Sequence, residues 1–281
     1  MEKVSILRGT PNRWKEFQLR YVQLISEALL LLRKCDDLKQ DEPTLNRLLY
    51  RCIVDANHNL NLDFIPSFEA KNPPHSEDKR RTKRENNIPD FSWPLMDHTA
   101  SDGNYDRNFA LECKRLGQKT SKNWILTEEY ITEGILRFFL EEKGYGKGCE
   151  TGAMVGYVQD MEFDAILTEV NSNISRHKPS IPLLSVPTSG WQPQVVNYLT
   201  HTFQRPYIPT TFFLQHFWVD MRDCCFLPSP GGTEDFSSEQ QALISGKKSK
   251  GRTTKQKHSE RTQAKKSYQI ALPIDQEEKN T

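Results

Sequence analysis

Apolar residues recur at helical spacing in the first sixty positions of the chain. From Trp14 to about Cys35 they fall three and four positions apart, behind a Thr10-Pro11 pair typical of a helix start. A second run begins near Pro43, where one face carries Leu45, Leu48, Leu49, Cys52 and Ile53. The spacing predicts two amphipathic helices that serve packing, followed by a short strand over residues 59–65.

Shorter apolar runs predict strands and helices further along. Residues 88–96 and 106–116 favour two strands joined by a turn at 101–104, whose sequence SDGN suits a hairpin. A helix is expected from Thr127, as its cap, to Gly144, and a strand over 153–159. Residues 161–170 favour a helix, and residues 195–204 and 210–221 favour two final strands. The pattern predicts an α/β protein.

The composition changes at residue 228. Residues 228–281 hold few apolar side chains, so a flexible basic tail is expected. Its positive run, residues 247–266, either adds salt-dependent affinity for nucleic acid or only keeps the chain soluble. Residues 267–274, SYQIALPI, regain alternation and could dock as an edge strand on this chain or on a partner.

Overall composition narrows the class of protein. The chain has 281 residues, 36% of them hydrophobic, with a mean hydropathy of −0.70 and a net charge of +1. Any nucleic-acid surface must therefore be local. Six cysteines without a CxxC pair indicate a reduced, cytoplasmic protein. No apolar run is long enough for a membrane span, and no membrane partner is expected.

One local basic cluster precedes the first predicted strand of the hairpin. Residues 70–87 contain a proline pair and many charges, so an exposed loop is expected. Its cationic residues are Lys79, Arg80, Arg81, Lys83 and Arg84. They are either a solvated loop or a contact for a phosphate backbone.

Candidate chemistry gathers on the second strand of the hairpin. Alternation places Glu112 and Lys114 side by side on one face, with Leu111 and Cys113 on the other. A second acid brought alongside would give two carboxylates and one ammonium, which suits Mg²⁺. Asp90 is the preferred acid because it lies far enough from the turn to face Glu112. Asp97 and Asp106 are rival acids.

Pro89-Asp90, a spacer and Glu112-x-Lys114 resemble the PD-(D/E)xK nuclease superfamily, which includes restriction endonucleases. The order of strand, ExK strand, helix and strand is similar to its αβββαβ core. The segment from Leu111 through GILRFF to MVGYV also resembles small restriction-endonuclease-like proteins of bacterial antiphage defence, and the likeness covers roughly residues 87–160. With this resemblance, the predicted domain organisation is a helical part over residues 1–70, a nuclease core over 71–227 and the tail over 228–281.

The resemblance implies a Mg²⁺-dependent endonuclease, with Mn²⁺ as a possible substitute, that cleaves DNA more readily than RNA. Asp90, Glu112 and the main-chain carbonyl of Cys113 would hold the metal ion, and Lys114 would position the attacking water. Enzymes of this kind act as homo-oligomers or with a larger partner subunit, here one of a defence complex.

Four residues are secondary candidates. Arg137, on the predicted helix, either reaches a phosphate or is solvated. His201 and His216 either line a site or pack in the core. A strand-borne Ser/Thr and His followed by an arginine, here Arg205, is similar to a pattern that the defence nucleases carry late in the chain. The alternative functions are a catalytically silent subunit that binds nucleic acid or assembles a defence complex, and an unrelated α/β binding domain with a fortuitous ExK triplet.

Overall fold

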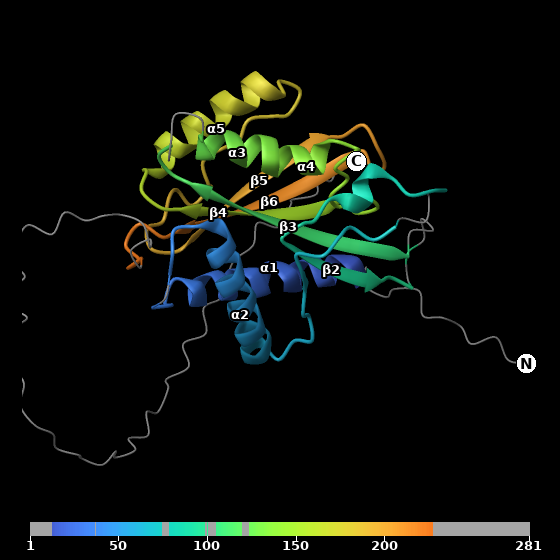
Figure 1. The fold of residues 1–281 in the computed structure, drawn as a ribbon, viewed down its shortest axis with the longest axis horizontal. Helices are drawn as coiled ribbons and strands as arrows, with labels where there is room; N and C mark the ends of the chain where they lie inside the picture. The colour runs from blue at the N-terminus through green and yellow to red at the C-terminus, as the bar shows by residue number, and fades with distance from the viewer. Residues whose placement is uncertain are drawn as a thin grey trace, which may run out of the picture. The chain divides into compact units, whose positions relative to one another are not determined.

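The fold is a mixed six-stranded β-sheet with helices on both faces (Figure 1). The computed structural model describes residues 13–36, 38–74, 79–98, 100, 105–119 and 124–226. The strands lie in the order β1-β2-β3-β4-β6-β5, with β3-β4 and β4-β6 parallel and the other pairs antiparallel. Their bounds are Ser67–Phe68 (β1), Phe91–Met96 (β2), Asp106–Leu116 (β3), Thr151–Val158 (β4), Val196–Gln204 (β5) and Thr211–Asp220 (β6). The predicted α/β class is confirmed.

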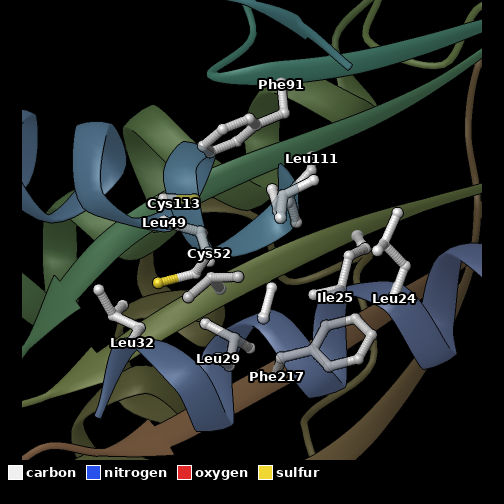
Figure 2. Packing of buried hydrophobic residues seen from close by; sticks show 14 of the residues in the cluster. Leu24, Ile25, Leu29, Leu32, Leu49, Cys52, Phe91, Leu111, Cys113 and Phe217 are labelled. Carbon is white, nitrogen blue, oxygen red and sulfur yellow. The ribbon is translucent and has the colours of Figure 1, made fainter. Parts of the chain in front are cut away.

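Two amphipathic helices cover one face of the sheet, as the sequence predicts. They are α1 (Arg13–Leu32) and α2 (Glu42–Leu60). Asp41 caps α2 by accepting a hydrogen bond from the Thr44 N–H to its Oδ1 at 2.9 Å. Figure 2 shows how apolar side chains of both helices meet the sheet: Leu24, Ile25, Leu29 and Leu32 of α1, Leu49 and Cys52 of α2, and Phe91, Leu111, Cys113 and Phe217 of the strands.

The opposite face carries a helix of three short segments and a long helix. The segments are α3 (Leu126–Tyr130), the π-helical η2 (Ile131–Ile135) and α4 (Leu136–Phe139), and the long helix is α5 (Phe163–His177). A Cβ at Gly134, inside η2, would lie 2.4 Å from the Met154 Cε. A side chain at position 134 would therefore displace the end of the flexible Met154 side chain where this helix approaches β4.

Several predicted boundaries are wrong. Residues 59 and 60 end α2, and Asn61 takes a left-handed conformation (φ 53°) that stops it, so no strand forms over 59–65. Thr127 is not a cap, because the helix begins one residue earlier and the Thr127 hydroxyl donates to the Glu169 Oε2 at 3.0 Å. The helix also ends at Phe139, before Gly144.

The exposed loop expected over residues 70–87 is partly structured. It contains the 3-10 helix η1 (Lys83–Asn86), and one of its arginines is buried. Four other predicted features lie outside the described residues: the Thr10-Pro11 helix start, the turn at 101–104, the tail with its positive run, and the segment 267–274. Across the described ranges, no helix combines the length and apolar character that crossing a membrane requires.

Candidate active site

The pairing of β2 with β3 brings two carboxylates together. Phe91 pairs with Leu111, so the same register continued by one residue sets Asp90 opposite Glu112. The Cys113 N–H donates to the Asp90 Oδ2 at 2.7 Å, which fixes that carboxylate against β3. Leu111 and Cys113 are buried on the α1–α2 face. The alternation predicted for this strand is therefore present in the structure.

Glu112 lies between two cations. Its side chain is 2% exposed, and its Oε1 lies 3.0 Å from the Lys114 Nζ and 3.2 Å from the Arg137 Nη1. Its second carboxylate oxygen, Oε2, is buried and has no hydrogen-bond partner. A buried carboxylate oxygen without a donor is costly, so this atom is set to accept a ligand from the site.

Lys114 is held by three oxygen atoms. Besides Glu112, its Nζ donates to the Glu42 Oε1 at 2.7 Å and to the main-chain carbonyl of Cys113 at 2.9 Å. Glu42 is the first residue of α2, and sequence reasoning missed its part in the site. No local pattern reveals it, since the contact joins positions 72 residues apart.

Arg137 is drawn into the same cluster. Its Nη2 pairs with the Glu133 Oε2 at 2.9 Å, one helical turn earlier, and its Nη1 donates to the Tyr145 hydroxyl at 2.8 Å. It is therefore not a solvated residue of the helix face. Glu133 and Tyr145 were not among the predicted residues.

Burial and repulsion between like charges raise the pKa values of the acids of this site. Burial, followed by the charge of Glu112, raises the pKa of Asp90 well above its ordinary value. Burial also raises the pKa of Glu112, against the opposing effects of Lys114 and Arg137. Burial disfavours the Lys114 ammonium, but Glu112, Glu42 and Asp90 outweigh it and raise the pKa of Lys114. Lys114 therefore stays protonated.

The cluster has an excess of negative charge that a divalent cation would offset. Its acids are Asp90, Glu112, Glu42 and Glu133, and its cations are Lys114 and Arg137, so ionised acids would leave a formal charge of −2. Carboxylate oxygen is the donor type that Mg²⁺ prefers.

The residues of the cluster could supply some, but not all, of the ligands of such a cation. In the described part of the chain, no three His, Cys, Asp or Glu side chains are grouped to hold a metal ion. Asp90 and Glu112 would thus be the two acidic ligands, with the Cys113 carbonyl and water completing the set. Mg²⁺ commonly keeps several waters in protein sites. The buried Glu112 Oε2 accepts no hydrogen bond, so it is free to serve as a metal ligand.

The rival acids lie elsewhere. Asp97 is buried and pairs through its Oδ2 with the Arg107 Nε at 3.3 Å. Asp106 pairs with Met96 at the beginning of β3, six residues and about 20 Å along the strand from Glu112. The structure therefore brings Asp90 to Glu112, and neither Asp97 nor Asp106.

The basic cluster separates into exposed and buried members. The side chains of Lys79, Arg80, Arg81 and Lys83 are exposed. Arg84 is 6% exposed, and its Nη2 donates to the Pro73 carbonyl at 2.7 Å. The expectation of an exposed Arg84 is wrong, because this side chain fixes the loop that carries the other four.

The late histidines and Arg205 serve the core. His216 is fully buried, with its Nδ1 2.7 Å from the Tyr130 hydroxyl, and the His201 Nε2 lies 2.6 Å from the Pro182 carbonyl. Burial lowers the pKa of both. In the sheet, Glu112 neighbours Met154 and Met154 neighbours His216, so the histidine is two strands, roughly 10 Å, from the acid.

Arg205 is 3% exposed and donates to the carbonyls of Pro209, Tyr145, Gly146 and Cys149 and to the Tyr207 hydroxyl. It therefore fastens the segment before β4 rather than facing a ligand.

A scan against protein-family models, a search of curated proteins and a search of solved structures each found no match. The geometry of the Asp90–Glu112 site is therefore the basis for assigning a function.

Proposed function

We propose that the protein is a metal-dependent nuclease that hydrolyses phosphodiester bonds of DNA, in the manner of the PD-(D/E)xK superfamily. The observation that carries the proposal is the meeting of Asp90 and Glu112 at the β2–β3 pair with Lys114 beside them. The order of elements supports it: helices, then antiparallel β1, β2 and β3, then a helix leading to β4 parallel to β3.

In this proposal Asp90, Glu112 and the Cys113 carbonyl hold a Mg²⁺ or Mn²⁺ ion. The ion would lower the pKa of a bound water and offset charge on the scissile phosphate. Lys114 remains protonated, so it would not remove a proton. To orient the attacking water or the phosphate, it would turn toward them one of the three N–H groups that now point to Glu112, Glu42 and the Cys113 carbonyl. Glu42 positions the ammonium of Lys114.

The exposed cations of the loop before β2 provide the contact for the DNA backbone. Contacts with phosphates do not distinguish one base from another. These contacts would therefore confer salt-dependent affinity for DNA without base preference, through Lys79, Arg80, Arg81 and Lys83. RNA is the less favoured substrate. Cleavage of both strands calls for a homo-oligomer or a larger partner subunit, and the biological setting proposed is bacterial antiphage defence.

The test is incubation of purified protein with plasmid, linear DNA, single-stranded DNA and RNA, with and without Mg²⁺. DNA cleavage should require Mg²⁺, and Lys114→Ala should abolish it while the circular dichroism spectrum stays native. The matched control is Lys119→Ala, since Lys119 is exposed just beyond the end of β3. Undiminished Mg²⁺-dependent cleavage by Lys114→Ala would overturn the assignment.

One observation favours a second candidate, a catalytically silent subunit that binds nucleic acid or assembles a defence complex. The Glu112 Oε1 already contacts both Lys114 and Arg137, so the site's own cations neutralise part of its charge. Such a subunit would bind DNA through the exposed basic residues, take up no Mn²⁺ and cleave none of the four substrates.

A further inference from the structure

Two thiols meet where the end of α1 lies against α2. The Cys35 Sγ and the Cys52 Sγ are 3.8 Å apart, and both cysteines are free. Cys52 is 4% exposed and lies among Leu29, Leu32 and Leu49 (Figure 2), whereas Cys35 is only partly buried. Cys35 is thus the more exposed residue of the pair.

The separation is that of two sulfur atoms in van der Waals contact. A disulfide requires them to approach to about 2.05 Å, so the two side chains must move toward each other on oxidation. Cys35 lies three residues beyond the end of α1, after the turn at residues 33 and 34, and its N–H donates to the Leu32 carbonyl at 3.1 Å.

The other cysteines are less suitably placed for a disulfide. Cys113 and Cys149 are buried, and the Cys149 Sγ is hydrogen-bonded to the main chain of Asn108. The Cys224 Sγ contacts the Arg33 carbonyl at 3.7 Å, and Cys225 is exposed. Cys224 is the main competitor for Cys35, because it also lies near the end of α1.

We propose that Cys35 and Cys52 form a reversible oxidation site that a hydroperoxide converts to a disulfide. The Cys35 thiol loses its proton as its sulfur attacks the peroxide oxygen, the O–O bond breaks, and Cys35 becomes a sulfenic acid while the departing hydroxide takes up that proton and leaves as water. The Cys52 sulfur then attacks the Cys35 sulfur, the S–O bond breaks, and the hydroxide departs as water with the Cys52 proton. Two thiols are oxidised and one H₂O₂ is reduced to two waters.

The order of attack follows from the surroundings of the two thiols. Burial, followed by the proximity of Cys35, raises the pKa of Cys52 to about 12, so Cys52 stays a thiol at neutral pH. Because Cys35 is the more exposed residue, we assign it as the sulfur that meets the oxidant first and Cys52 as the resolving residue.

The disulfide would close a ring that includes the segment leading to Glu42. Within that ring the Gln40 carbonyl accepts from the Gln159 Nε2 at 2.9 Å and from the Arg115 Nη1 at 3.2 Å, and Glu42 holds Lys114. Oxidation would therefore restrict the motion of the residues that dock on the ends of β3 and β4. The formation of the disulfide does not depend on the proposed nuclease function. Only the effect of this restriction on catalysis rests on that function.

The experiment treats reduced full-length protein with H₂O₂ and maps its peptides by mass spectrometry with and without reductant. We expect a reductant-sensitive cross-link between the Cys35 and Cys52 peptides, lighter than their sum by two hydrogen atoms. Cys35→Ser should abolish it, and Cys225→Ser, at an exposed position, should leave it unchanged. In Cys52→Ala, dimedone should trap a sulfenic acid at Cys35.

A cross-link from Cys35 to Cys224 or Cys225, or oxidation of Cys35 to the sulfinic acid without a cross-link in the native protein, would overturn the proposal. Amide hydrogen exchange over residues 39–45 should slow after oxidation, and unchanged exchange would refute the tether to Glu42. No readout involves cleavage, so failure here is distinguishable from failure of the nuclease proposal.

Discussion

Removal of the Lys114 ammonium tests the electrostatics of the candidate site without any ligand. Lys114→Met keeps the length of the side chain but leaves Glu112 with Arg137 as its cation. Glu42 loses the partner that lies 2.7 Å away. The Lys114 and Glu112 side chains are 9% and 2% exposed, so water replaces the lost ion pair poorly.

The magnitude follows from the burial of the pair. Removing one partner of a buried ion pair costs about 3–5 kcal/mol, and the remaining contact with Arg137 places this case near 3 kcal/mol. Because 1 kcal/mol shifts Tm by about 2–4 °C in a domain of this size, Lys114→Met should lower Tm by about 6–12 °C. Glu112→Gln combined with Lys114→Met should cost less than the sum of the single changes, by about 1–3 kcal/mol.

The assay is thermal and urea unfolding of the four proteins of this cycle at neutral pH without divalent cations. Lys119→Met is the matched control, and its exposed side chain should change stability by less than about 0.5 kcal/mol. Additive effects of Glu112→Gln and Lys114→Met, or a Lys114→Met protein as stable as the control, would refute the buried pair.

Two further predictions concern the residues that proved structural. Burial lowers the folded-state pKa of His201 and His216, so the unfolded chain binds more protons, and stability should fall as pH drops below about 6.5 by up to about 1.4 kcal/mol per pH unit for each histidine. The raised pKa values of Asp90 and Glu112 act in the opposite direction, so the test is the difference between two proteins. In urea unfolding from pH 7.5 to 5, His216→Gln should lose less stability than the native protein, and an equal slope in the variant would contradict the assignment. Arg205→Met leaves the buried carbonyls of Gly146 and Cys149 without a hydrogen-bond donor. It should lower the free energy of unfolding in urea by about 3 kcal/mol or more, whereas Arg80→Met should leave that free energy unchanged.

The sequence predicted correctly those features that depend only on the regular geometry of a single strand. Alternation along β3 predicts the shared face of Glu112 and Lys114, and in the structure Leu111 and Cys113 lie in the core on the other side. Asp90 is the preferred acid because of its distance from the predicted turn, but counting outward from residues 101–104 would set it opposite Arg115. The register that pairs Phe91 with Leu111, and so brings Asp90 to Glu112, comes only from the structure.

The failures come from contacts between distant segments. Thr127 followed by two glutamates is typical of a helix cap, but its hydroxyl bonds Glu169 of α5 instead. Arg84 has the same chemistry as Arg80 and Arg81, and it is buried because a 3-10 turn aims it at Pro73. Glu42 enters the site only because α2 begins beside β3, a contact that no spacing in the sequence encodes.

The central claim, that Asp90 and Glu112 hold a divalent cation, is tested most directly by titration of the protein with Mn²⁺, followed by electron paramagnetic resonance. We predict one site per chain in the native protein, its loss in Asp90→Asn and in Glu112→Gln, and unchanged binding in Asp97→Asn with the fold intact. Because both acids have raised pKa values, binding should weaken as the pH falls and the carboxylates take up protons. Equal Mn²⁺ binding by the native protein and Glu112→Gln, or no binding by the native protein, would contradict the account.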